Sequence, residues 1–579
     1  MSYLKSVGTA VIYIGLILAV ITFIPGLPPE AEFVEYNITP PRQFDPKVGP
    51  KNRLNGIQKL FDGAINAPES FGSYDGQLYT GVHGGYVLRI EEDDIVPIVK
   101  FGKKCDGIWQ EQKCGRPLGL KFDEKGNLYV VDAYYGIFKV NVATGEYTNI
   151  VNVTKPIDGK VSRIPNSIDI AKNGDMYWTD SSTDFALNDL VMTFLMNPSG
   201  RLIRYNAAKK ENEVLIRNLA FANGVVLSDD ESFVIVTETV RNRIMKYNLK
   251  GPKAGQHEIF IDGLPGAPDN IHSDGHGGFL LSLIVTTNNP ELPQIYQSLI
   301  PHPYLRKMLV RLFVTMELPF KLLNDVYPNP YTERILHAIG SHQGIEFLSD
   351  PKQKSLVLRI DASGNIIEIL TSDDGSAHDI SSAYIHNGFL WFGTPFKNYL
   401  GRVPLKQAFP DLADSAKQSS HTRSEKHSSN VAASGAKTER VKRDTGSTTV
   451  KPIESNRASQ TTPKPTAAPT TTPKPKTTAA PKSSSVPKTD KPTATASNVK
   501  PSETKSSTNA EVKKDNAKPV DDAKSNSPKF EKSNKKEDTA KTQSEKKVKV
   551  EQNASAKQTE QKSQSEKVKR ETNRPKDDL

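Results

Sequence analysis

Short apolar strands and polar turns alternate along residues 54–410. Each turn is rich in Asp, Gly and Asn, and it precedes a short strand rich in Tyr, Val, Ile and Trp, which a second strand often follows. The turns recur near residues 75, 125, 174, 229, 275 and 387, and all steps except the last span about 45–55 residues, the usual length of a four-stranded propeller blade. This pattern predicts an all-β fold, a six-bladed β-propeller over residues 54–410.

The last step between turns is about 112 residues long, so we expect an insertion, which we place at residues 290–345. Apolar side chains recur there at the spacing of a helix, at Leu305, Met308, Leu309, Leu312 and Phe313. The simpler interpretation is a pair of helices packed on one face of the propeller. The alternative is a lid over a substrate site, or a face that rests on a membrane.

The N-terminus carries an apolar segment without charges, residues 7–24, which is near the lower limit for a membrane-spanning helix. Lys5 precedes it, and three glutamates follow it. Because positive charge stays in the cytosol, we predict six cytosolic residues, 1–6, then a signal anchor of type II at 7–24 and a lumenal or extracellular stalk at 25–53. The alternative is a cleaved signal peptide, although we see no small-x-small cleavage site after the segment.

Residues 411–579 differ in composition from the rest of the chain. They contain about 36 of the 76 basic residues, 22 of the 66 acidic residues, and one aromatic residue, Phe530. We therefore predict a disordered Thr/Pro/Lys-rich, mucin-like tail, in which residues 459–510 accept O-glycans; a plain linker is the alternative. Since the excess positive charge lies in this tail, the composition disfavours a folded nucleic-acid-binding protein.

Two features indicate an oxidising compartment. Sequons for N-glycosylation begin at Asn37, Asn152 and Asn553. The two cysteines, Cys105 and Cys114, are nine positions apart, a spacing that suits a local disulfide across a turn and is too poor in ligands for a zinc site.

The tail also contains a basic tetrad with the spacing that furin-like proteases recognise. It consists of Arg440, Lys442 and Arg443 around a valine. Cleavage there would release the mucin-like tail from the anchored propeller.

The chain lacks the standard catalytic and nucleotide-binding motifs: G-x-S-x-G, H-E-x-x-H, a Walker A loop and G-x-G-x-x-G. It instead places acid and amide residues at equivalent positions of four blades, each just before a strand that we expect at the centre of a blade. These residues are Glu69, Asn166, Asn223, Asp269 and Asn270. Oxygen ligands of low total charge suit Ca²⁺. The alternative is that they are only turn formers.

Four blocks of sequence resemble the strictosidine synthase-like family, and within it the adipocyte plasma membrane-associated proteins. The blocks are CGRPLGLKFDEKGNLYVVDAYYG, IPNSIDIAKNGDMYWTDSS, FANGVVLSDDESFVIVTET and LPGAPDNIHSDGHGGFLLSL. The resemblance covers about residues 1–410 and implies a six-bladed propeller with a disulfide in its second blade.

The wider superfamily includes paraoxonases and gluconolactonases, which hold Ca²⁺ in the propeller channel. The matching residues here are the same five: Glu69, Asn166, Asn223, Asp269 and Asn270. The resemblance implies that Asp269 would be both a calcium ligand and a candidate catalytic base.

The sequence departs from the family enzymes at two positions. Ile385 stands where the plant synthase carries its catalytic glutamate, which argues against alkaloid synthesis. Leu118 stands where paraoxonases carry a histidine, and the histidines that could replace it are His272, His276 and His378, although a single histidine near a propeller turn is usually structural.

Two functions remain open. The first is a cell-surface mucin-type glycoprotein whose calcium-binding propeller carries O-glycans for lectins, microbes or other cells, which the resemblance places on blood cells in innate defence. The second is a weak calcium-dependent arylesterase or lactonase for a small ester or lactone. Both predict a single-pass type II protein of the cell membrane, or of the endoplasmic reticulum and secretory pathway.

Overall fold

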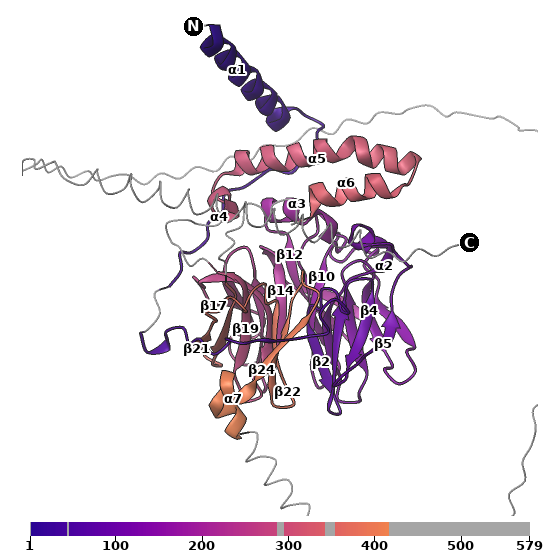
Figure 1. The fold of residues 1–579 in the computed structure, drawn as a ribbon, viewed down its shortest axis with the longest axis vertical. Coiled ribbons are helices and arrows are strands. Elements are labelled where there is room, and N and C mark those ends of the chain that lie inside the picture. The colour runs from indigo at the N-terminus through magenta and orange to yellow at the C-terminus, as the bar shows by residue number, and fades with distance from the viewer. Residues whose placement is uncertain (1, 43–45, 287–294, 342–353, 416–579) are drawn as a thin grey trace, which may run out of the picture. The chain divides into compact units, whose positions relative to one another are not determined.

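A computed structural model describes residues 2–42, 46–286, 295–341 and 354–415, all within one compact unit of the chain. In these residues, twenty-four strands form six four-stranded antiparallel sheets, shown in Figure 1. The sheets follow one another along the chain, and the first strand of each contacts the first strand of the next. The prediction of a six-bladed propeller is confirmed.

Five blades are built from consecutive strands. The first contains β2 (Phe71–Tyr74), β3 (Gln77–Val82), β4 (Tyr86–Ile90) and β5 (Ile95–Lys100). The second contains β6 (Pro117–Phe122), β7 (Leu128–Asp132), β8 (Gly136–Val140) and β9 (Tyr147–Val151). The third contains β10 (Pro165–Ile170), β11 (Met176–Asp180), β12 (Gly200–Asn206) and β13 (Glu211–Leu219). The fourth contains β14 (Ala222–Leu227), β15 (Phe233–Glu238), β16 (Arg243–Asn248) and β17 (His257–Ile261). The fifth contains β18 (Gly266–Ser273), β19 (Phe279–Thr286), β20 (Leu356–Ile360) and β21 (Ile366–Leu370).

The sixth blade joins the two ends of the propeller. Its strands β22 (Ser382–His386), β23 (Phe389–Gly393) and β24 (Leu400–Pro404) are completed by β1 (Gln58–Leu60), whose Gln58 lies opposite Arg402. The short helix α7 (Leu405–Ala408) follows β24. Residues on either side of this seam are bonded directly: Arg53 Nη1 donates to Ala408 O over 3.1 Å, and Gln407 Nε2 donates to Arg53 O over 2.9 Å. The closing strand was not predicted from the sequence.

Six clusters of apolar side chains lie between neighbouring blades, and two more lie under the helices. Between the fourth and fifth blades, for example, Ile235 and Ile244 pack with Leu281 and Leu358. A blade is therefore buried on both faces, and β14 and β15 are buried at every position. This explains why the strands contain continuous apolar runs instead of the alternation of a half-exposed sheet.

The helices α2 to α6 lie on the face of the propeller where the first strands begin, whereas α7 lies at the opposite end, as Figure 1 shows. They include η2 (Ile108–Gln110) and α2 (Glu111–Cys114) before the second blade, and η3 (Leu187–Asp189) and α3 (Leu190–Leu195) in the third. The largest group interrupts the fifth blade between β19 and β20: α4 (Ile295–Leu299), α5 (Pro303–Val326) and α6 (Pro330–Gly340). The helical insertion that we expected is present, and α5 and α6 form its helix pair.

Local sequence signals set the ends of the helix pair. Pro303 and Pro330 occupy first-turn positions, where the missing N–H costs no hydrogen bond. The Asn329 side chain caps α6 by accepting from the backbone N–H groups of Tyr331 and Thr332, each over 3.1 Å. Glu333 of α6 then accepts from Gln110 Nε2 over 2.6 Å, which attaches the helix pair to the second blade.

The chain before the propeller begins with α1 (Ser2–Phe23), followed by η1 (Pro46–Val48). Among the described helices, the part of α1 from Lys5 to Phe23 is long and apolar enough to cross a membrane. The segment that we expected as a stalk, 25–53, packs on the propeller: Phe33 and Tyr36 are buried, and Asn197 Nδ2 donates to Glu32 O over 2.6 Å.

Cys105 and Cys114 form a disulfide, as the spacing predicted. Cys114 is fully buried beside the first and second blades. Replacing both cysteines with serine should lower the free energy of unfolding by about 2–3 kcal/mol, because the closed loop of about ten residues restricts the unfolded chain. Chemical denaturation of the oxidised protein and the double variant would measure this, and equal midpoints would contradict it.

Candidate metal centre

Four of the five residues proposed as metal ligands lie inside first strands. Asn166 is in β10, Asn223 in β14, and Asp269 and Asn270 in β18, while Glu69 precedes β2. The expectation that each lies just before a strand therefore holds only for Glu69. All five are buried, with 2–7% of their surface exposed.

Irregular strands explain how these side chains are positioned. The pairing registers shift between Pro165 and Ile168 in β10, between Ala222 and Val225 in β14, and between Pro268 and Ile271 in β18. The four candidate ligands that lie in strands are thus within the bulged segments. Because a bulge places two residues opposite one, it changes the direction of the side chains at that point.

A glycine beside the bulges lets neighbouring first strands approach closely. A Cβ atom at Gly224 would lie 2.7 Å from Asp269 O and 2.8 Å from Asn270 Cα. Any side chain at this position would push β14 away from β18, and with it Asn223 away from Asp269. The close approach requires glycine here.

Several polar atoms of this cluster have no hydrogen-bond partner in the described structure. They include Asn223 Oδ1, Asp269 Oδ1 and Asn270 Nδ2. Buried oxygen atoms without donors are costly unless a cation binds them. The residues present therefore fit a Ca²⁺ ion, which prefers carboxylate and amide oxygens.

Burial and like charge shift the pKa values of the two carboxyl groups, Asp269 and Glu69. Burial raises the pKa of Asp269 well above its usual value, and the nearby Glu69 carboxylate raises it further. Burial also raises the pKa of Glu69, although the charge of Arg116 opposes the shift. A bound divalent cation would reverse both shifts because it favours the charged forms.

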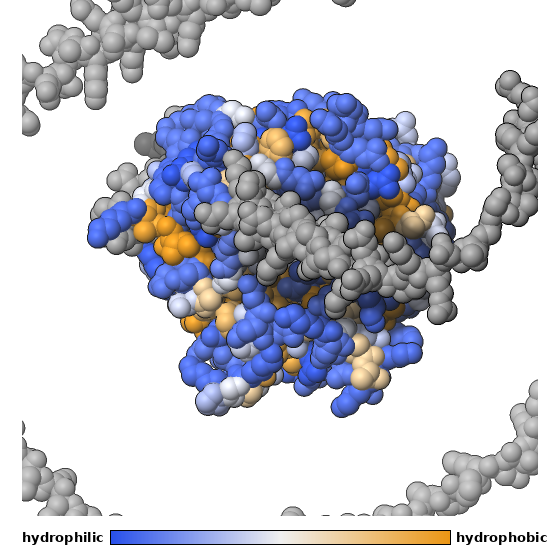
Figure 2. Space-filling model, turned by 90° about the horizontal axis from the view of Figure 1, so that it is seen from below, coloured by the Kyte–Doolittle hydropathy of each residue, from blue (hydrophilic) through white to orange (hydrophobic). Residues whose placement is uncertain are grey.

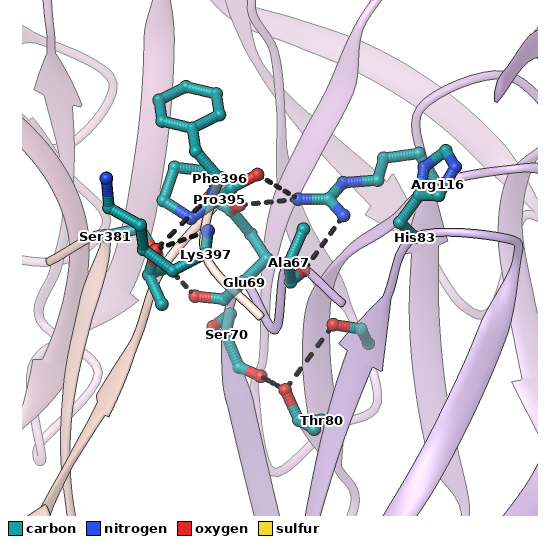
Figure 3. A network of polar contacts seen from close by, with 12 residues as sticks. Ala67, Glu69, Ser70, Thr80, His83, Arg116, Ser381, Pro395, Phe396 and Lys397 are labelled. Carbon is teal, nitrogen blue, oxygen red and sulfur yellow. Dashed lines mark hydrogen bonds and ion pairs between the residues drawn. The ribbon is translucent and has the colours of Figure 1, made fainter. Parts of the chain in front are cut away.

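Arg116 fixes Glu69 in a network that joins three blades (Figure 3). Its guanidinium donates to Glu69 Oε2 over 3.0 Å, to Ala67 O over 2.9 Å and to Pro395 O over 3.3 Å. Ser381 Oγ donates to Glu69 O over 2.7 Å. Arg116 was not predicted from the sequence. It directly precedes β6, whereas the position of this blade that matches Asn166 is Leu118, because Pro117 pairs with Asp132 as Pro165 pairs with Asp180.

A second polar group lies beside this network. His83 Nδ1 is 3.0 Å from Glu111 Oε1, and Tyr134 Oη donates to Glu111 Oε2 over 3.0 Å. Burial acts to raise the pKa of Glu111, but His83 and Arg116 outweigh it, so the pKa is lowered. His83 also lies close to both cysteine sulfurs, yet these form the disulfide and cannot bind a metal.

Two of the histidines named from the sequence, His272 and His276, lie away from the candidate ligands, at and after the end of β18. His272 lies at the opposite end of the first strands, beside a cavity of about 320 Å³ that Ile385 also lines. Its Nε2 is 2.7 Å from Ser382 Oγ, and burial lowers its pKa to about 3, so it is neutral at physiological pH. This cavity opens away from the helices, toward the face that Figure 2 shows.

The carboxyl group of Asp132, at the end of β7, makes the free energy of unfolding depend on pH. Its Oδ1 accepts from the backbone of Tyr134 and Tyr135, Oδ2 has no partner, and burial raises its pKa to about 7. An unfolded aspartate titrates near about 3.9, so the unfolded chain binds fewer protons between pH 4 and 7. This group therefore lowers the free energy of unfolding as pH rises through that window.

Asp132→Asn should remove this loss of stability at higher pH, because an asparagine does not ionise. The shift of about three pKa units corresponds to about 4 kcal/mol, and an amide without a partner subtracts about 1–2 kcal/mol. We expect the variant to be about 2–3 kcal/mol more stable than the parent at pH 8 and about 1–2 kcal/mol less stable below pH 4, where the aspartate is protonated in both states. Urea denaturation across this pH range measures the difference, and a constant difference would contradict the assignment.

The remaining predicted sites divide between the described and undescribed parts of the chain. Asn37 and Asn152 are exposed, and Thr154 donates to the Asn152 carboxamide oxygen through its N–H and its hydroxyl. Asn553 and the tetrad Arg440, Lys442 and Arg443 lie outside the described residues.

Comparison with known proteins places these features in context. The pattern of strictosidine synthase matches residues 166–252, and that of the N-terminal part of strictosidine synthase-like proteins matches residues 50–90. The chain is 40% identical over 395 residues to the adipocyte plasma membrane-associated protein Hemomucin of Drosophila melanogaster, covering 67% of this chain and 68% of that protein. It is 31% identical over 371 residues to the adipocyte plasma membrane-associated protein of Rattus norvegicus, covering 63% of this chain and 90% of that protein.

Solved structures align with the chain only at low similarity. The calcium-binding protein regucalcin of Agrobacterium tumefaciens aligns with 12% identity and a TM-score of 0.36, covering 60% of this chain and 92% of that chain. These values are too low to support an argument about the site.

Proposed function

We propose that this chain, which belongs to the adipocyte plasma membrane-associated protein family, is a single-pass type II glycoprotein of the cell membrane. Its propeller lies outside the cell and carries an O-glycosylated tail for recognition by lectins, microbes or other cells. The relatives are plasma membrane-associated by name, and α1 supplies a helix that can anchor this chain.

The observation that carries the proposal is the Cys105–Cys114 disulfide on a propeller with exposed sequons. A disulfide persists in the secretory pathway and outside the cell, and is rare in the cytosol. Asn37 and Asn152 are both exposed, as glycosylation requires. With Lys5 on the cytosolic side of α1, these features support an extracellular propeller.

Calcium has a structural role in this proposal. Glu69, Asn166, Asn223, Asp269 and Asn270 would hold it where four blades meet, and the orphaned oxygens of Asn223 and Asp269 support this assignment. A metal at this point stabilises the propeller that presents the tail.

The test compares three forms of the protein on cells: the full chain, a chain that ends at residue 415, and the full chain with Asp269→Asn. We expect a panel of lectins to bind the full chain and the Asp269→Asn variant, and to lose binding when the tail is absent or its O-glycans are removed enzymatically. An antibody to the propeller controls for surface expression. Equal lectin binding with and without the tail would contradict the proposal.

A second candidate function is calcium-dependent hydrolysis of a small ester or lactone, for which Ca²⁺ would polarise the substrate carbonyl. The observation in its favour is the free Oδ1 of Asp269, a buried carboxyl beside the other ligands. Phenyl acetate and a lactone panel, assayed with calcium and with chelator, test it. Turnover that chelation and Asp269→Asn both abolish would establish the hydrolase, and its absence would leave the metal structural.

A further inference from the structure

Helix α5 is apolar on two opposite faces. One face is fixed to the propeller: Val310 is buried, and the buried Arg306 donates to Leu195 O over 3.0 Å and to Ile300 O over 3.1 Å. The opposite face carries a second apolar stripe at helical spacing, formed by Leu305, Met308, Leu312, Met316, Leu323 and Val326. We call these six residues the outer stripe.

The outer stripe is largely uncovered in the described structure. Val326 is 86% exposed and Leu323 50%, and Leu305 and Met316 are also exposed. The propeller explains one apolar face of α5 and leaves the other without a partner. An apolar stripe of this length on an exposed helix face indicates a contact with protein or with a membrane.

The beginning of α5 is joined to the end of the membrane anchor. Arg311 lies on the flank of α5 next to the outer stripe, and its guanidinium donates to Thr22 O over 3.0 Å and to Ile24 O over 2.9 Å. These carbonyls end α1, so the cation occupies the position that the helix dipole favours. The rings of Phe23 and Tyr304 are 5.8 Å apart.

This junction fixes the height of α5 relative to the bilayer. Phe23 and Ile24 are where the apolar span ends, so the helix bound to them lies at the level where α1 leaves the membrane. Figure 1 shows α5 running across the top of the propeller, between α1 and α6. A helix of 24 residues is about 36 Å long and offers an extended contact.

We infer that the outer stripe of α5 lies in the outer interface of the same bilayer that α1 spans, so that the propeller rests on the membrane with its helical face. The inference depends on α1 being a membrane anchor, as proposed above. Three exposed tyrosines at the ends of the helix pair, Tyr304, Tyr327 and Tyr331, provide the amphipathic rings that the headgroup region favours.

The bilayer fits the stripe better than a second copy of the chain does. A membrane is already present at this point of the structure, because α1 ends against α5. Within the stripe there is no charged side chain, which suits contact with lipid along its whole length.

The experiment uses the full chain in phosphatidylcholine nanodiscs that hold one chain each. The only two cysteines form the disulfide, so a single new cysteine can be labelled with an environment-sensitive fluorophore. The test positions are Leu323→Cys and Val326→Cys. The matched control is Ile259→Cys, an apolar position of the fourth blade that is 48% exposed. Val11→Cys reports on the anchor.

We expect labels at positions 323 and 326 to be quenched by a nitroxide on the lipid, and quenching by aqueous iodide to be at least about threefold weaker there than at position 259. Iodide quenching as strong as at position 259, with the label at position 11 in lipid, would overturn the inference and leave the anchor intact. A label at position 11 outside lipid would instead contradict the anchor. Shielding without nitroxide quenching, seen only with two chains in one disc, would show that a second copy covers the stripe and would also overturn the inference.

Discussion

Replacing Arg116 with methionine should destabilise the propeller by about 3–5 kcal/mol, because it leaves the buried Glu69 carboxylate without its cation. The guanidinium also donates hydrogen bonds to the carbonyl oxygens of Ala67 and Pro395. Both oxygens would lose this donor in a buried site, where solvent does not replace it. Since the three partners lie in different blades and loops, the loss affects the point where the first and last blades meet.

Equilibrium denaturation in the presence of chelator measures this effect without a contribution from bound metal. Arg89→Met is the matched control, since Arg89 pairs with Glu91 on the exposed surface, and such pairs contribute about 0–1 kcal/mol. Adding Glu69→Gln to Arg116→Met should recover part of the loss by removing the unpaired charge. A loss in Arg116→Met no greater than that in Arg89→Met would show that the buried pair is unimportant for stability.

Calcium should raise the stability of the protein by about 4 kcal/mol when its free concentration is a thousand times its dissociation constant. The folded chain offers a set of oxygens whose partners are missing, whereas the unfolded chain offers no such set, so the ion stabilises the folded state alone. Asp269→Asn should abolish most of this gain because it removes one of the two carboxylates and with it half of the negative charge.

Thermal denaturation with added calcium, with added magnesium and with chelator tests this prediction. Magnesium should have a much smaller effect, since it requires a regular octahedron that ligands fixed on four blades do not provide. Asp229→Asn, at a turn outside the cluster, is the control and should keep the full response to calcium. An unchanged melting temperature of the parent protein in chelator would refute a stabilising calcium site.

The sequence predicted the features that recur or that have a strong local signal. The turn period indicated six blades because every blade needs the same tight turn between its first two strands. The spacing of Leu305, Met308 and Leu312 indicated α5. It did not indicate β1, because three residues, Gln58–Leu60, are too few to show a strand pattern and gain their structure from pairing with β24.

The sequence predicted which residue types form the candidate site, but it did not predict the charged group that pairs with them. Asn223 and Asp269 stood out because acid and amide residues occupied equivalent positions in several blades. Arg116 did not, since a single basic residue has no such repetition, and its three contacts come from residues 47–279 positions away. The bulges that aim the ligands are also set by pairing between strands, which a linear pattern does not contain.

The pairing of β1 with β24, which closes the sixth blade, determines how the propeller responds to a pulling force on its two ends. In the pair of β1 and β24, Gln58 faces Arg402 and Leu60 faces Leu400, so the chain toward the anchor and the chain toward the tail leave from the same end. Tension between the two ends would separate the two strands one residue pair at a time. It would not load all their hydrogen bonds at once, as a shearing force does. The bonds of Arg53 to Ala408 and of Gln407 to Arg53 lie at that end, and they would bear the force once the packed segment before β1 has been released. A tail pulled away from the cell surface is then resisted at the sixth blade by these few bonds.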